Sequence, residues 1–223
     1  MWNSGWDNVF SQSEWGKYPS EDLVRFVERT FRGSKDRNCI RVLEVGCGPG
    51  ANVLYFAREG FNIYGIDGSA QALRRCEQRL SLEGLSANLS KGDAMTLPYE
   101  DSSFDLVVDV ECIYANDLND SQAIIAECVR VLTPGGIMFS KTFMSNLSGT
   151  QSGEHLPQEP LTFTRLPDSP LRGDYGIVRL TSEDQIPILY GALERLVWDS
   201  VVRTDRDRTS TIGEWIISGR KPS

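Results

Sequence analysis

An apolar run that ends in closely spaced glycines constrains this chain more than any other feature. Residues 40–45 read Ile-Arg-Val-Leu-Glu-Val, and Gly46, Gly48 and Gly50 follow at alternate positions. Such a run predicts a buried strand, and the glycines allow the backbone to turn abruptly and to approach a ligand closely. Residues 51–58 read as a helix whose free N-terminal N–H groups would point into the same space. The stretch therefore predicts a strand, a glycine loop and a helix around a bound molecule.

The glycine spacing alone leaves the bound molecule open. Gly46-x-Gly48-x-x-Ala51 also fits the dinucleotide fingerprint G-x-G-x-x-G/A. Glu44 argues against a dinucleotide, because a carboxylate two residues before the first glycine would lie close to the pyrophosphate. The same carboxylate would attract a cationic ligand, which we therefore favour.

Composition limits the class of protein. With 223 residues, of which 40% are hydrophobic, the chain suits one well-buried domain with additional segments, and its net charge of −8 argues against a surface that follows nucleic-acid phosphates. The five cysteines form no C-x-x-C pair, which predicts reduced intracellular thiols and no metal site. The first four residues lack the basic and apolar regions of a leader, and no run approaches the ~18 apolar residues of a membrane span. We therefore expect a cytoplasmic protein with no membrane partner.

Asp67 ends a second predicted strand, over residues 62–66. Parallel strands joined by a helix have their carboxyl ends at the same edge of a sheet, so Asp67 should lie beside the glycine loop, where it could accept hydrogen bonds from a ribose diol. The alternative is an N-cap for the next helix, predicted over residues 70–83. Ser69 is the better cap for that helix, so we favour the ribose.

Strands continue to alternate with helices as far as residue 143. A weak strand is predicted over residues 85–90 and a strong one over residues 104–110. A helix beginning at Asp120 or Ser121 then leads to a fifth strand, over residues 137–143. This order predicts a parallel sheet with right-handed crossovers and a cleft at its carboxyl edge.

Five motifs in this order resemble those of the class I S-adenosylmethionine-dependent methyltransferases, of the small-molecule, Rossmann-like type. They are Glu44-Val45-Gly46-Cys47-Gly48-Pro49-Gly50, Asp67, Gly92-Asp93-Ala94, Phe104-Asp105-Leu106-Val107-Val108 and Leu132-Thr133-Pro134-Gly135-Gly136. The resemblance implies an α/β fold with a doubly wound, mostly parallel seven-stranded sheet, helices on both faces and an antiparallel C-terminal strand. It also implies S-adenosyl-L-methionine as the cofactor.

The resemblance assigns cofactor contacts by position. It places Glu44, Gly46, Cys47, Gly48 and Gly50 around the methionine part, Asp67 on the ribose, Asp93 and the Ala94 amide at the adenine, Gly68 and Ser69 near the adenosine, and Val110 near the methionine end. The methionine moiety carries an ammonium and a sulfonium, so this assignment agrees with the independent argument from Glu44.

Two segments outside the 40–143 core could cover the cofactor. Residues 1–33 form an aromatic arm and a helix that Ser20 would cap. The aromatic side chains of the arm are either buried for stability, or residues 15–18 fold over the cofactor and bring Tyr18 to it. Residues 145–176 contain four prolines and no clean period, which favours a partly ordered lid over a disordered segment. Residues 177–223 should form a helix and a strand pair, over residues 196–203 and 214–220.

Methyl transfer from a sulfonium mainly requires that a nucleophile be aligned and water excluded. Glu111 and Tyr114 follow the fourth predicted strand and are the candidate catalytic residues, whereas Cys112 is expected to be packed. His155 is expected to be a solvated residue of the predicted lid, and it is the alternative base. No Asn/Asp-Pro-Pro-aromatic motif follows that strand, unlike in nucleic-acid amino-methyltransferases. We therefore expect transfer to a hydroxyl or amine of a small-molecule acceptor.

Three alternatives remain. One is an NAD(P)-dependent Rossmann oxidoreductase, although the chain contains no Tyr-x-x-x-Lys. The others are a non-catalytic S-adenosylmethionine-binding module and a protein methyltransferase. The oligomeric state is left open.

Overall fold

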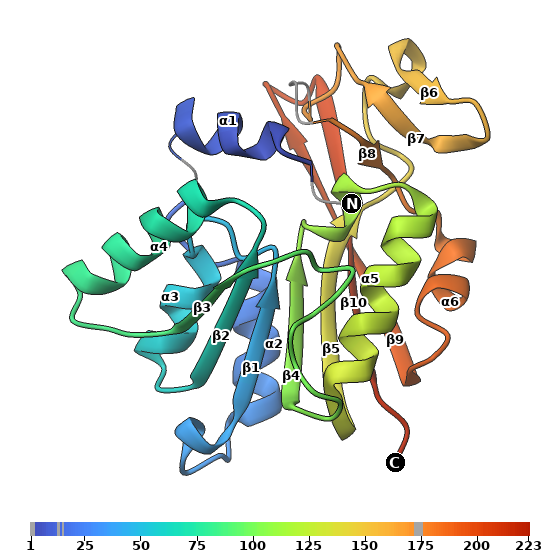
Figure 1. Ribbon diagram of the computed structural model, residues 1–223. Helices are drawn as coiled ribbons and strands as arrows, with labels where there is room; N and C mark the ends of the chain where they lie inside the picture. Colours follow the sequence, from blue (N-terminus) through green and yellow to red (C-terminus); the bar gives the residue numbers. More distant parts are fainter. Residues whose placement is uncertain (1–2, 13, 15, 172–175) are drawn as a thin grey trace.

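A seven-stranded sheet forms the centre of the structure, a computed structural model that describes residues 3–12, 14, 16–171 and 176–223 (Figure 1). The strand order is β3-β2-β1-β4-β5-β10-β9. β1 to β5 are parallel, and β10 pairs antiparallel with both β5 and β9. The strands are β1 (Arg41–Val45), β2 (Asn62–Asp67), β3 (Asn88–Lys91), β4 (Phe104–Val110), β5 (Leu132–Phe143), β9 (Glu194–Asp205) and β10 (Ser210–Arg220). The predicted fold class is confirmed.

The chain reverses its direction of travel across the sheet at β1. From β1 it moves outward to β2 and β3, and it then returns to β4 on the other side of β1. Val45 is in register with Ile66 of β2 and with Asp109 of β4. The loops that follow Val45, Asp67 and Val110 therefore meet at one edge, which is where open α/β sheets bind ligands.

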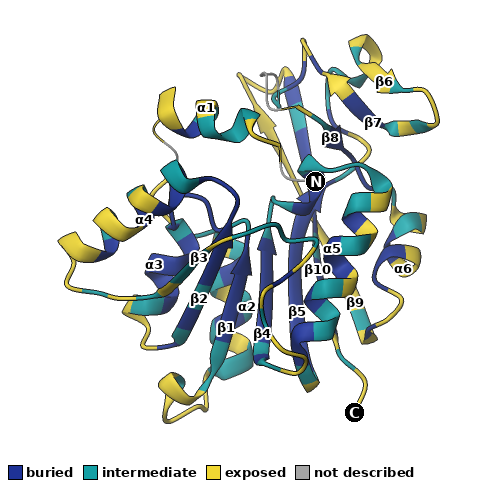
Figure 2. Cartoon of the chain, in the orientation of Figure 1, coloured by how far each residue is buried: buried dark blue, intermediate teal, exposed yellow. Residues whose placement is uncertain are grey.

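Helices cover both faces of the sheet because alternate strand residues point to opposite sides. Val42 and Leu106 pack with the face that carries α2 (Glu21–Phe31), α3 (Ala51–Arg58) and α4 (Ala70–Leu82). Leu43 and Val107 pack on the other face, with α5 (Leu118–Val131) and α6 (Ile186–Leu189). Figure 2 shows the buried strands between these two layers.

Several predicted boundaries differ from the structure. Asp117, and not Asp120 or Ser121, caps α5, because its side chain accepts from the amide of Asp120 at 2.8 Å. β3 covers Asn88–Lys91, and β5 begins at Leu132 instead of residue 137. The pairing of β4 with β5 is irregular between the Phe104 and Leu106 pairs. The proline and the two glycines of β5 lie in this irregular stretch, where they do not have to make the regular backbone hydrogen bonds of a sheet. The predicted Ser20 cap makes no side-chain capping bond.

The segment after β5 has its own small sheet. β6 (Glu154–Leu156), β7 (Glu159–Arg165) and β8 (Val178–Arg179) pair antiparallel, and their apolar side chains pack against Tyr114 and Phe143. The short helices of the chain are α1 (Gly5–Gln12), η1 (Arg37–Cys39), η2 (Ile113–Ala115), η3 (Thr150–Ser152) and η4 (Glu183–Gln185). Figure 1 shows α1 and the small sheet beyond the carboxyl ends of the parallel strands.

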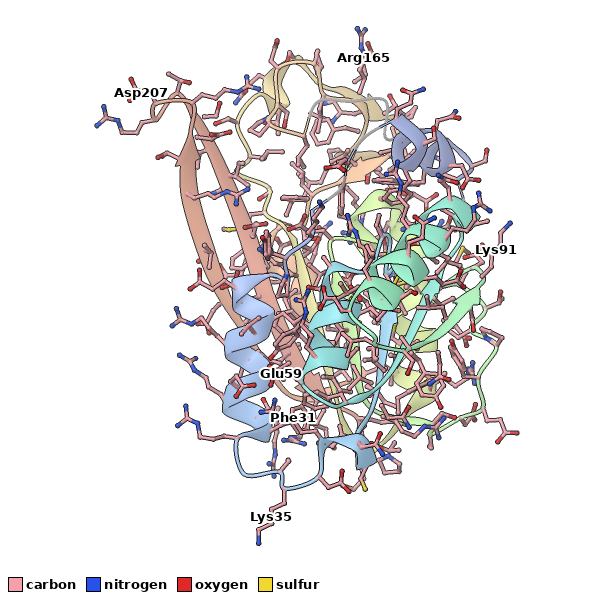
Figure 3. All side chains as sticks on the ribbon, turned by 90° about the vertical axis from the view of Figure 1, so that its left-hand side faces the viewer. Phe31, Lys35, Glu59, Lys91, Arg165 and Asp207 are labelled. Carbon is pink, nitrogen blue, oxygen red and sulfur yellow. The ribbon has the colours of Figure 1, made fainter. Side chains whose placement is uncertain are left out.

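Several charged side chains project from the outer surface. In Figure 3, Lys35, Lys91 and Arg165 reach away from the body of the molecule, and Asp207 marks the projecting tip of the β9–β10 hairpin. Within the described ranges, none of the helices combines the length and the apolar character that crossing a membrane requires.

Candidate active site

A cavity of about 670 Å³ lies where the loops after β1, β2 and β4 meet. Most of the residues predicted to contact the cofactor or to act in catalysis line it. They are Tyr18, Glu44, Gly46, Cys47, Gly48, Asp67, Gly68, Asp93, Ala94, Val110, Glu111 and Tyr114. Gly50 and Ser69 stand behind this wall, and the ligand roles of all these residues remain predictions.

The glycine loop is shaped by two different requirements. A Cβ on Gly46 would overlap the Sγ of Cys112, and one on Gly50 would overlap the Sγ of Cys76. A Cβ on Gly48, where φ is +51°, would meet only the Phe10 ring, at 3.6 Å. At Gly46 and Gly50 the missing side chain therefore allows a thiol to pack against the loop, and close approach of a ligand to the loop backbone stays a prediction. Gly48 faces the cavity.

Asp67 holds the loop in place. Its carboxylate accepts from the amide of Gly48 at 2.8 Å and from the amide of Ser69 at 2.7 Å. Burial raises the pKa of Asp67, and the two amide bonds oppose that shift. Ser69 caps α4 by accepting from Ala72, as predicted. Each oxygen of Asp67 has a second lone pair, so the carboxylate can also accept from a ligand hydroxyl.

Glu44 is the most unusual group in the cavity. It is 2% exposed, and its Oε1 accepts from Nδ2 of Asn52 at 2.7 Å, whereas its Oε2 has no hydrogen-bond partner among the described residues. Burial raises the pKa of Glu44 to about 8. Asn52 also accepts from the amide of Ser20 at 3.2 Å, which ties the start of α2 to this carboxylate. Sequence reasoning did not find Asn52, although its position in the first turn of α3 directs it toward the loop.

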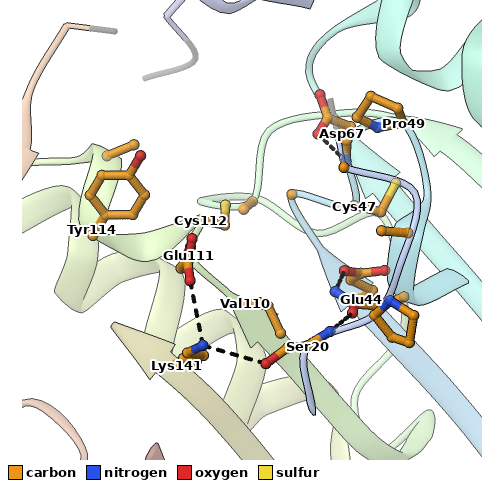
Figure 4. A pocket seen from close by; sticks show the side chains of 18 of the residues that line it. Ser20, Glu44, Cys47, Pro49, Asp67, Val110, Glu111, Cys112, Tyr114 and Lys141 are labelled. Atoms are coloured by element: carbon orange, nitrogen blue, oxygen red, sulfur yellow. Dashed lines mark hydrogen bonds and ion pairs between the residues drawn. The ribbon is translucent and has the colours of Figure 1, made fainter. Parts of the chain in front are cut away.

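A second charged group lies at the other end of the cavity (Figure 4). Nζ of Lys141 is 3.2 Å from a carboxylate oxygen of Glu214, 3.4 Å from one of Asp22 and 3.7 Å from one of Glu111. Burial, with Glu214 beside it, raises the pKa of Glu111 to about 7. Sequence reasoning did not identify the ion-paired residues Lys141, Glu214 and Asp22 as part of the site. The available signal was a lysine near the end of a predicted strand that is expected to be buried on both faces.

Asp109 fixes the turn that carries Glu111. One of its oxygens accepts from the amides of Cys112 and Ile113 at 2.9 and 3.1 Å, and the other accepts from the Ser140 hydroxyl at 2.5 Å. Ser140 is in turn 2.8 Å from the Tyr190 hydroxyl. Glu111 itself has a φ of +57°, which a non-glycine residue rarely adopts. These bonds hold the turn in a conformation that directs Glu111 toward Lys141.

The N-terminal segment covers the cavity. Trp6 and Phe10 of α1, together with Gly16 and Tyr18, line it, and Asp7 hydrogen-bonds to the hydroxyl of Ser69. Trp2 and Trp15 lie outside the described residues. Tyr18 is 84% exposed, so only part of its side chain faces the cavity.

The described residues of the insertion, 145–171 and 176, do not line the cavity as the N-terminal segment does. His155 is exposed, and its Nδ1 lies 2.7 Å from the carbonyl oxygen of Pro160. Tyr114 is 6% exposed and packs edge to face on Phe143, with ring centroids 4.9 Å apart. The insertion therefore contacts the active site through Tyr114, and closure as a lid remains a prediction.

Known proteins share both the sequence core and the fold. A family model described as a methyltransferase domain matches residues 42–136. Phthiotriol/phenolphthiotriol dimycocerosates methyltransferase 1 of Mycobacterium ulcerans is 39% identical over 122 residues, which are 54% of this chain and 43% of that protein. Norajmaline N-methyltransferase of Rauvolfia serpentina is 35% identical over 97 residues, which are 42% of this chain and 32% of that enzyme. The matches thus span less than half the length of these relatives.

Two solved structures show how far the fold is shared. A S-adenosylmethionine-dependent methyltransferase of Methanosarcina mazei has a TM-score of 0.73 at 22% identity, covering 92% of this chain and all of that one. The 1,6-didemethyltoxoflavin-N1-methyltransferase of Burkholderia thailandensis, with bound 1,6-didemethyltoxoflavin and S-adenosylhomocysteine, has a TM-score of 0.64 at 14% identity, covering 98% and 83%. Residues 42–136 thus match a methyltransferase domain, and the chain as a whole shares the fold of S-adenosylmethionine-dependent methyltransferases of known structure.

Proposed function

We propose that this protein transfers a methyl group from S-adenosyl-L-methionine to a hydroxyl or amine of a small-molecule acceptor by direct displacement. The observation that carries the proposal is the unpaired Oε2 of Glu44, buried beside the glycine loop. A buried carboxylate oxygen without a hydrogen-bond donor is costly, and an ammonium group from a ligand would supply that donor to Oε2 of Glu44. The residues present therefore fit the methionine end of the cofactor.

The rest of the cavity wall suits the remaining parts of that molecule. Asp67 would accept from the ribose hydroxyls while it keeps its two amide bonds. Asp93 and Ala94, on the loop after β3, would contact the adenine. Val110, at the end of β4, would lie near the methionine end. A dinucleotide would instead bring its pyrophosphate toward Glu44 and Asp67, which charge repulsion disfavours.

The cofactor supplies an electrophilic methyl group on a sulfonium, so the protein has to position an acceptor and exclude water. Trp6 and Phe10 would exclude water from one side of the cavity. Glu111 is the candidate base, because a carboxyl group whose pKa is raised to about 7 can take up a proton near neutral pH. Tyr114 would contact the acceptor.

A small acceptor is supported by the size and charge of the cavity. Its volume of about 670 Å³ is within the range of small-molecule sites. Carboxylates outnumber cations along its wall, which opposes a nucleic-acid strand. The printed names of two similar proteins describe N-methyltransferases. A protein acceptor is the second candidate, and the acceptor panel below includes one.

Calorimetry of the full chain with S-adenosylhomocysteine and with NAD tests the cofactor. We expect saturable binding of S-adenosylhomocysteine and none of NAD, and the reverse would refute the proposal. Turnover is then measured as S-adenosylhomocysteine release on a panel of amines, alcohols, phenols and a peptide mixture. Glu111→Gln should lower kcat by ~10²-fold with cofactor affinity nearly unchanged, the usual scale for a general base.

A further inference from the structure

The cavity wall as a whole is rich in carboxylates. Glu44, Asp67 and Asp93 belong to the part assigned to the cofactor, whereas Asp22, Glu111 and Glu214 surround Lys141 in the part that we call the acceptor end. Among the described residues that line the cavity, seven are acidic and three are basic. The acidic ones are Glu21, Asp22, Glu44, Asp67, Asp93, Glu111 and Glu214, and the basic ones are Arg25, Lys141 and Arg203. Arg25 is 3.5 Å from Glu21, and Lys141 faces three carboxylates. An anionic acceptor would have to compete with these carboxylates for Arg25 and Lys141.

The carboxylates around Lys141 come from separate elements that converge on one spot. Asp22 is on α2, Glu214 on β10, and Glu111 on the turn after β4, while Lys141 is on β5 and Arg203 faces the group from β9. The side chain of Glu214 is 3% exposed and that of Lys141 is 10% exposed, whereas the side chain of Glu111 is 36% exposed and opens onto the cavity. The side chain of Asp22 is 24% exposed, so Glu111 is the member of the group that is most open to a molecule in the cavity.

We propose that the acceptor is an amine that enters as its ammonium ion, and that Glu111, with Glu214 and Asp22 close by, binds the ammonium and takes its proton before methyl transfer. This inference rests on the proposed methyltransferase function. It replaces the open choice between hydroxyl and amine with one class of acceptor, selected by the charge at this end of the cavity.

The step balances without a further reactant. An N–H bond of the ammonium breaks, its electron pair stays on nitrogen, and the proton joins the Glu111 carboxylate to give a neutral carboxyl group. The freed lone pair then forms the N–C bond to the methyl group, and the electron pair of the breaking C–S bond moves to sulfur. The products are a methylated ammonium ion, S-adenosylhomocysteine and a protonated Glu111, which returns its proton to solvent.

An amine and a phenol of similar pKa differ in how proton transfer to Glu111 changes the charges in the cavity. The amine of lysine and the phenol of tyrosine both have ordinary pKa values of about 10, so the strength of the base does not distinguish them. Proton transfer from an ammonium to Glu111 removes a positive and a negative charge together. Proton transfer from a phenol would instead move the negative charge from Glu111 to the phenolate, where it would still lie beside Glu214 and Asp22. The cavity therefore favours the amine.

Binding of three matched probes tests the inference without requiring turnover. Benzylamine, benzyl alcohol and benzoate share one ring and differ in charge. We measure their dissociation constants by ligand-observed NMR at pH 8, with the full chain saturated with S-adenosylhomocysteine. Benzylamine should bind at least tenfold more tightly than the other two. Equal binding, tighter binding of benzoate, or undetectable binding of all three would overturn the inference.

Substitutions test which side chains give the preference for benzylamine. Glu111→Gln and Glu214→Gln should each weaken benzylamine binding at least fivefold and leave S-adenosylhomocysteine affinity within twofold. Asp22→Asn provides a less buried variant in case the Glu214 substitution disturbs folding, and Glu77→Gln on α4 is the exposed control, which should change neither affinity. Failure of the wild type to bind S-adenosylhomocysteine would refute the proposed function, whereas normal cofactor binding without an amine preference would refute this inference alone.

Discussion

Replacing Glu44 by glutamine should stabilise the free protein while it impairs the active site. Glutamine keeps the shape of the side chain and can still accept the bond from Asn52. It removes a charge that is buried without a full set of partners. The native state therefore no longer bears the free-energy cost of ionising this group at neutral and high pH.

The magnitude follows from the pKa of Glu44, which burial raises from 4.5 to about 8. Because the folded pKa is raised, the native state binds the proton more tightly than the unfolded chain, so wild-type stability falls as pH rises from the unfolded pKa to the folded one and is constant above it. Relative to a side chain that never ionises, the loss is ~1 kcal/mol at pH 5, ~3 at pH 7 and ~5 at pH 9. Glu44→Gln should gain up to these amounts.

Urea unfolding of both proteins at pH 5, 7 and 9, followed by tryptophan fluorescence, measures the difference. The advantage of Glu44→Gln should grow across this range, and the exposed control Glu77→Gln should stay within ~0.5 kcal/mol of wild type at each pH. Saturating S-adenosylhomocysteine should then raise the midpoint of the wild type more than that of the variant. A variant that is less stable than wild type at pH 9, or a difference that does not change with pH, would refute the reasoning.

Asp67→Ala should weaken cofactor binding by roughly 1.5–3 kcal/mol by calorimetry, because it removes both a ribose acceptor and the anchor of the Gly48 amide; a much smaller loss would favour a purely structural role. Gly46→Ala should lower the free energy of unfolding by ~2 kcal/mol or more, since its Cβ would overlap Cys112, and an unchanged urea midpoint would contradict this packing. Gly48→Val should abolish cofactor binding in a protein that remains folded, and unchanged affinity would remove the loop from the binding site. Residues 145–176 should be cleaved more slowly by protease when cofactor and acceptor are both bound, because ligand contacts offset the entropy cost of closure; identical rates would contradict a lid.

Local patterns were sufficient to predict the core of the fold. The apolar run before Gly46 and the alternation of strands with helices depend on periodicities that each segment carries in its own sequence. The small sheet of β6 to β8 was not predicted, because its strands are short and much of their surface is exposed, so they show little alternation. The start of β5 was misplaced because proline and glycine usually interrupt a strand, whereas here they occupy an irregular stretch.

The residues of the candidate site likewise fall into those that the sequence could predict and those that it could not. Glu44, Asp67 and Glu111 could be proposed because each stands at the end of a predicted strand. The residues that contact these carboxylates could not be predicted. Lys141 and Glu214 reach the cavity only through the pairing of distant segments, such as that of Glu214 with Phe143 across β10 and β5. A sequence pattern contains no such register, so the charge balance of the acceptor end emerged only with the structure.

The reactivity of the thiols packed against the glycine loop can report how often that loop opens. Burial raises the pKa values of Cys47, Cys76 and Cys112, so their reactive thiolate forms are scarce in the closed loop. Cys76 is fully buried and does not line the cavity, so an alkylating reagent can modify it readily only when the loop separates from its supports. The rate of alkylation therefore measures how often the empty binding loop opens, and saturation with cofactor should slow it. Cys39, which is exposed, supplies the internal reference.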